Sequence, residues 1–123
     1  MTMARIIVIE DDTASQKLMG YLLTAAGHEV VVCGDGSVGL AAARRGPVDL
    51  VLCDLQLPGL SGYEIAQALR ADPATRDLPL VAVTAQAMQG DRDKALAAGF
   101  SGYIAKPIEP RTLAADVAAY LRT

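Results

Sequence analysis

The stretch IIVIEDDTASQKLMGYLLTAAG, residues 6–27, changes its periodicity at three consecutive acidic residues. Before them, Ile6–Ile9 is an unbroken apolar run, which is typical of a strand buried on both faces. After them, residues 13–26 place apolar side chains at helical spacing, and Gly27 is typical of a helix end. The stretch therefore predicts a buried strand followed by a helix, and we expect Thr13 and Gln16 to form a capping box at the helix start.

The same alternation continues along the chain. Apolar runs at 30–33, 50–53, 80–83 and 102–105 alternate with segments of helical period at 37–45, 63–70, 88–98 and 110–121. Such alternation predicts an α/β fold with a parallel sheet covered on both faces. Five strand–helix units fit a doubly wound, flavodoxin-like sheet of order 2-1-3-4-5. We expect one domain over residues 1–123 without an output domain, and a stand-alone protein rather than an excised piece.

Composition excludes several classes of function. The 123 residues are 52% hydrophobic and 20% charged with a net charge of −3, and no basic run suggests nucleic-acid binding. No apolar run reaches the ~18 residues of a membrane span, and no signal peptide is evident, so we expect a cytoplasmic protein. Cys33 and Cys53 should be buried thiols about two strand spacings apart, roughly 10 Å, too far for a disulfide.

Polar residues follow several of the expected strands. Asp11 and Asp12 follow the first strand, Asp54 the third, Thr84 the fourth and Lys106 the fifth. In a doubly wound sheet, ligands bind beyond the carboxyl ends of the strands. Clustered carboxylates repel one another without a cation, and their hard oxygens suit Mg²⁺. With an aspartate nucleophile and a lysine, the set matches the needs of phosphoryl transfer.

These motifs resemble those of receiver domains of two-component response regulators, the CheY-like superfamily, over essentially the whole chain. The matching segments are IEDD, DLQLPGLSG around Asp54, VAVTA ending in Thr84-Ala85, and YIAKP. Asp54 and Thr84 are thirty positions apart and Thr84 and Lys106 twenty-two, as in the family pattern. The sequence is most similar to stand-alone single-domain receivers and to receivers of hybrid kinases.

The resemblance implies a phosphoacceptor and a metal site. Asp54 would be the phosphorylated residue. Asp12 would bind Mg²⁺ directly, Asp11 would act mostly through water, and the carbonyl oxygen of Gln56 would complete the protein ligands. Glu10 would be a strand-end residue that points away from the metal, outside the site.

It also implies the residues that respond. Lys106 would pair with Asp54 and then with the phosphoryl group, and its peptide bond to Pro107 would be cis. Thr84 would move toward the phosphoryl oxygen. Tyr103 would then swing inward to fill the space that Thr84 leaves; otherwise it is a plain surface aromatic.

The implied partners follow from this chemistry. The donor would be a phosphohistidine on a histidine kinase or histidine phosphotransfer protein, and the domain would catalyse only its own phosphorylation and dephosphorylation. Phosphorylation would shift the population of a surface at about 87–121, comprising the fourth helix, fifth strand and fifth helix, toward contact with a downstream protein. We hypothesise that Gln56 and Gln86 tune the phosphoryl lifetime by positioning or blocking water; otherwise both are solvated loop amides.

Three alternatives remain open. An aspartate-nucleophile phosphohydrolase would carry a second Asp two positions after the nucleophile, where this chain has Gln56. A degenerate receiver would bind a partner without being phosphorylated. The chain could also be a receiver excised from a hybrid histidine kinase.

Overall fold

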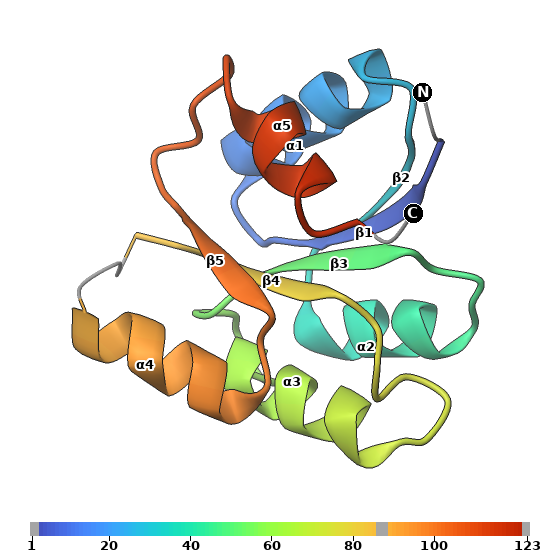
Figure 1. Cartoon of the computed structure of the whole chain (residues 1–123), viewed down its shortest axis with the longest axis vertical. Coiled ribbons are helices and arrows are strands. Elements are labelled where there is room, and N and C mark those ends of the chain that lie inside the picture. Colours follow the sequence, from blue (N-terminus) through green and yellow to red (C-terminus); the bar gives the residue numbers. More distant parts are fainter. Residues whose placement is uncertain (1–2, 86–88, 122–123) are drawn as a thin grey trace.

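The sheet is parallel and has the predicted strand order. The computed structural model describes residues 3–85 and 89–121. These residues form five strands in the order β2-β1-β3-β4-β5 (Figure 1). The strands are β1 (Arg5–Ile9), β2 (Glu29–Cys33), β3 (Leu50–Asp54), β4 (Leu80–Thr84) and β5 (Gly102–Ala105). The predicted order 2-1-3-4-5 is therefore confirmed.

Helices cover both faces of the sheet. They are α1 (Thr13–Ala25), α2 (Gly36–Arg44), α3 (Gly62–Ala71), α4 (Gln89–Ala98) and α5 (Leu113–Ala118). Figure 1 shows α1 and α5 on one face and α2, α3 and α4 on the other. Because both faces are covered, β3 and β4 are buried at every position, which explains their unbroken apolar runs. None of the described helices is long and apolar enough to cross a membrane.

The start of α1 differs from the prediction. Asp12, not Thr13, is the N-cap, and its carboxylate accepts hydrogen bonds from the amide and the hydroxyl of Ser15 at 2.9 and 2.8 Å. Gln16 forms no capping box, because its side-chain amide donates to the carbonyl oxygen of Glu10 at 2.5 Å. Asp caps a helix as well as Thr, so the pattern alone did not identify which residue ends the extended segment.

The last helix is shorter than the predicted 110–121. The amides of Thr112 and of Leu113, the first residue of α5, donate to the carbonyl oxygen of Glu109 at 3.2 and 3.1 Å, in the turn that leads into the helix. At the other end, the amides of Tyr120 and Leu121 bond to carbonyl groups only three residues earlier. The apolar period continues through these turns, which explains why it predicted a longer helix.

The two cysteines are confirmed as buried free thiols. Cys33 and Cys53 are both paired in register with Ile9, one on each side of β1. A whole strand therefore separates them, as the topology required.

Candidate functional site

Asp54 is the last residue of β3, at the carboxyl edge of the sheet, and only 8% of its surface is exposed. One carboxylate oxygen accepts a hydrogen bond from the amide of Gln56 at 3.1 Å, and the other lies 3.2 Å from Nζ of Lys106. The start of α3 approaches the end of β3 so closely that a Cβ on Gly62 would lie 2.5 Å from the carbonyl oxygen of Asp54. Glycine at this position lets the start of α3 contact the end of β3 directly.

Glu10 belongs to the same site, and the prediction that it points away is wrong. Its surface is 0% exposed, and one carboxylate oxygen lies 2.7 Å from Nζ of Lys106. The other oxygen accepts a hydrogen bond from the amide of Asp12 at 3.1 Å. Three consecutive acidic residues do not reveal from their sequence which side chain points into the site. The contact with Lys106, which is distant in sequence, identifies Glu10 as that residue.

Three carboxylates gather at this edge. Oxygens of Glu10, Asp11 and Asp54 lie within 4.8 Å of one another, with Asp11 exposed to solvent. Asp12, which the sequence predicts as the direct metal ligand, is not in this group, because its carboxylate caps α1 through Ser15. The hard, closely spaced oxygens fit a Mg²⁺ ion that keeps part of its water.

Among the described residues, the cluster holds three carboxylates but only one paired amine, that of Lys106. Burial raises the pKa of Glu10, and the nearby charge of Asp54 raises it further, although the hydrogen bond from Lys106 opposes both. Burial alone would lower the pKa of Lys106, but Glu10 and Asp54 outweigh it and raise that pKa. Lys106 is therefore a fixed cation paired with two of the three carboxylates, and a divalent cation would relieve the remaining repulsion.

The other predicted site residues occupy the expected elements. Thr84 is the buried last residue of β4, and the Lys106–Pro107 peptide bond is cis, as expected. The side chain of Gln56 is exposed, while Gln86 lies outside the described residues. The roles given to Thr84, Gln56 and Gln86 stay predictions.

Two contacts of α4 were missed by the sequence reasoning. The guanidinium of Arg92 lies 4.4 Å from the ring centroid of Tyr103 on β5, and Nζ of Lys94 lies 4.7 Å from the ring centroid of Tyr63 on α3. Tyr103 is half-buried. Helical period identifies faces but not the aromatic partner on another element, so the sequence offered no signal for these contacts.

Comparison with known proteins identifies a matching family and relatives of similar sequence. Residues 6–118 match the response regulator receiver domain family. The chain is 39% identical over 119 residues to the response regulator PleD of Caulobacter vibrioides, covering 97% of this chain but 26% of PleD. It is 36% identical over 116 residues to the polar-differentiation response regulator DivK of Brucella anthropi, covering 94% of each.

A solved receiver-domain structure has the same fold. The receiver domain of the sensor histidine kinase PA1611 from Pseudomonas aeruginosa PAO1 superimposes with a TM-score of 0.88 and 33% identity, over 97% of this chain and 98% of that one. That structure has a magnesium ion coordinated in its active-site cleft. The chain thus spans about a quarter of PleD yet nearly the whole of DivK and of this isolated receiver.

Proposed function

This chain belongs to the response regulator receiver domain family of two-component signalling, and we propose that Asp54 is its phosphoacceptor. The observation that carries the proposal is that the Asp54 carboxylate lies 3.2 Å from Nζ of Lys106 and has an oxygen within 4.8 Å of carboxylate oxygens of Glu10 and Asp11. A nucleophile beside both a fixed cation and a divalent-metal site is what phosphoryl transfer requires.

The metal site that we propose differs from the prediction in two respects: Glu10 takes the place of Asp12, and Asp11, which the sequence predicts to act mostly through water, becomes a direct ligand. Asp11 and Asp54 would hold Mg²⁺ directly, the carbonyl oxygen of Gln56 would add a third ligand, and Glu10 would act through water. When bound, the ion supplies positive charge against the phosphoryl oxygens. Asp12 stays at the helix start, where one oxygen of its carboxylate accepts two hydrogen bonds from Ser15.

The phosphoryl donor that we propose is a phosphohistidine on a histidine kinase or histidine phosphotransfer protein in the cytoplasm. The P–N bond to the imidazole breaks as a P–O bond to Asp54 forms, and the leaving imidazole takes up a proton. Lys106 stays protonated throughout because its carboxylate neighbours raise its pKa, so it neutralises charge rather than transferring a proton. Beyond this self-modification, we propose no enzymatic activity.

The output that we propose is a change in protein contacts. Lys106 and Thr84 follow the new phosphoryl oxygens, and Tyr103 moves inward behind Thr84. The surface of α4, β5 and α5 then favours a downstream protein, or the phosphoryl group passes onward in a relay. Both outputs suit either a stand-alone protein or the receiver of a hybrid kinase.

The test is phosphorylation with acetyl phosphate and Mg²⁺, followed by intact-protein mass spectrometry. We expect one added phosphoryl group per chain, lost in Asp54→Asn and after removal of Mg²⁺ with a chelator. Asp49→Asn is the matched control, because it removes another aspartate that flanks β3 from the opposite edge of the sheet.

Each other outcome counts against the proposal. An adduct of equal yield in Asp54→Asn would place the acceptor elsewhere. Multiple turnover of the donor without an adduct would favour the phosphohydrolase, and no adduct under any condition would favour the degenerate receiver. Decay rates of the adduct in Gln56→Ala and Gln86→Ala test their proposed control of its lifetime, and rates equal to the parent would contradict it.

A further inference from the structure

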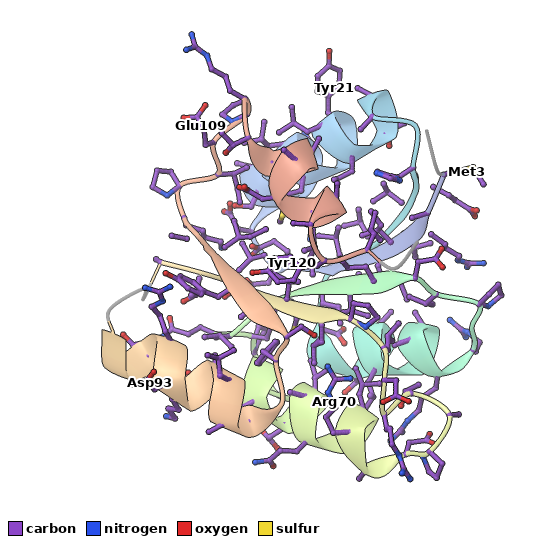
Figure 2. All side chains as sticks on the ribbon, viewed as in Figure 1. Met3, Tyr21, Arg70, Asp93, Glu109 and Tyr120 are labelled. Atoms are coloured by element: carbon purple, nitrogen blue, oxygen red, sulfur yellow. The ribbon has the colours of Figure 1, made fainter. Side chains whose placement is uncertain are left out.

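Gln16 is a polar residue on the buried face of α1. It precedes Met19 and Leu23, the buried residues of that helix, by three and seven positions, so helical spacing places all three on one face. The opposite face reaches solvent, because Tyr21 is 73% exposed and points away from the sheet in Figure 2. Gln16 itself is half-buried. An amide at the start of a buried face needs a hydrogen-bond partner, and Gln16 finds one outside its own helix.

The partner of Gln16 is the backbone at the end of β1. Its side-chain amide donates to the carbonyl oxygen of Glu10 at 2.5 Å. The same amide nitrogen would lie 3.6 Å from a Cβ on Gly34, the residue that follows β2. Gln16 therefore reaches from α1 to the place where β1 and β2 end side by side, and it bonds to the peptide group that leads into Asp11.

This peptide group sets the direction of Asp11. A peptide group is planar, so a hydrogen bond to the carbonyl oxygen of Glu10 also orients the amide of Asp11. On the other side of the same residue, the amide of Glu10 donates to the carbonyl oxygen of Cys33 at 3.0 Å, and its carboxylate lies 2.7 Å from Nζ of Lys106. The carboxylate of Asp11 is exposed, so burial does not hold it in place. Its direction therefore depends on the backbone to which Gln16 bonds.

A fixed carboxylate matters more for Mg²⁺ than for a larger cation. Mg²⁺ takes oxygen ligands at about 2.0–2.1 Å in near-octahedral geometry, whereas Ca²⁺ accepts about 2.3–2.6 Å and variable geometry. A ligand whose backbone can turn therefore weakens a rigid coordination shell more than a flexible one. Groups that orient a ligand without touching the metal commonly change its affinity by about 10- to 100-fold.

We propose that Gln16 is a positioning residue, which keeps Asp11 directed toward Asp54 and thereby makes the site select Mg²⁺ over Ca²⁺. This inference rests on the magnesium site proposed above, in which both aspartates would be ligands. Gln16 acts through the backbone of Glu10 and not by contact with the metal. Its influence on phosphorylation is indirect, because it changes how fully Mg²⁺ occupies the site.

The test is isothermal titration calorimetry of the metal-free protein with Mg²⁺ and, separately, with Ca²⁺, without any phosphodonor. Gln16→Met keeps the length and the helix propensity of glutamine but removes the donor. In this variant we expect the Kd for Mg²⁺ to rise about tenfold and the Kd for Ca²⁺ to rise less than about threefold. Gln16→Asn keeps the amide but falls one methylene short of the carbonyl oxygen, so it should show the same selective loss.

The matched control is Gln67→Met, which makes the same change at an exposed position of α3 and should leave both constants as in the parent. Unchanged constants in Gln16→Met, or an equal rise of both, would overturn the role of Gln16 and leave the metal site standing. A parent that binds no Mg²⁺ would overturn the proposed metal site and this inference with it. If the selective loss is seen but the protein is never phosphorylated, Asp54 fails as the acceptor and the role of Gln16 stands.

Discussion

The choice between Asp11 and Asp12 as the metal ligand can be decided by thermal unfolding with and without Mg²⁺. Asp11 shares its cluster with Glu10 and Asp54, whereas Asp12 caps α1 through Ser15. Asp11→Asn removes a charged ligand from the cluster. Asp12→Asn removes the same charge but keeps a good N-cap, because Asn caps helices as well as Asp.

The expected size of the magnesium effect follows from linkage. At a concentration of one hundred times Kd, an ion that binds only the folded state stabilises it by about 2.7 kcal/mol. Unfolding entropy near 2.1 cal/mol/K per residue amounts to about 0.26 kcal/mol/K for this chain of 123 residues. Saturating Mg²⁺ should therefore raise the Tm of the parent by about 10 °C.

The assay is differential scanning calorimetry of three variants, each with Mg²⁺ and with a chelator. Asp11→Asn should lose most of the increase and, in the chelator, should unfold at or above the Tm of the parent, because one of three crowded carboxylates is gone. Asp12→Asn should keep the full increase. Asp12→Ala should lower Tm by the same amount in both conditions, since it loses the cap and not the ion.

One result would contradict Asp11 as the metal ligand. If Asp12→Asn abolished the magnesium effect while Asp11→Asn kept it, the helix cap would have to give way to the ion, and the ligand set expected from the sequence would be correct.

Three further predictions follow from the same geometry. In metal-free protein, the pKa of Glu10 is raised in the folded state, so protonated Glu10 stabilises the fold. This contribution to stability is full below the ordinary pKa of 4.5 and is lost as pH rises through the raised pKa of the folded state. Urea unfolding between pH 4 and 8 should show that Glu10→Gln lacks this loss of stability, and a loss equal to that of the parent would contradict the prediction. Gly62→Ala should destabilise the domain by about 1–3 kcal/mol and slow phosphorylation, because the new methyl meets the backbone of Asp54; unaltered values of both would show that the loop yields freely. Burial raises the pKa of both Cys33 and Cys53 thiols, so iodoacetamide should label them only after unfolding; stoichiometric labelling of the native protein would exclude the buried positions.

The hydrophobic pattern predicted the strands of the sheet correctly, but it did not predict where the helices begin and end. Strands buried on both faces need apolar residues at every position, and so Leu50–Asp54 and Leu80–Thr84 stand out in the sequence. The N-cap of α1 and the turns around α5 depend on individual hydrogen bonds, such as that of Ser15 to Asp12, which several neighbouring residues could make equally well. Residue identity alone does not show which of these alternative hydrogen bonds forms.

The sequence by itself determined the strand order and the edge at which Asp54, Thr84 and Lys106 meet, because parallel strands carry their last residues to the same side of a sheet. Only the tertiary structure decided which acids after β1 face Asp54. That choice depends on Lys106, fifty-two positions from Asp54 along the chain, which draws the Glu10 carboxylate inward to 2.7 Å while Ser15 holds Asp12 at the helix start. Local sequence encodes which groups are available, but the direction in which adjacent side chains turn is set by partners that folding brings together.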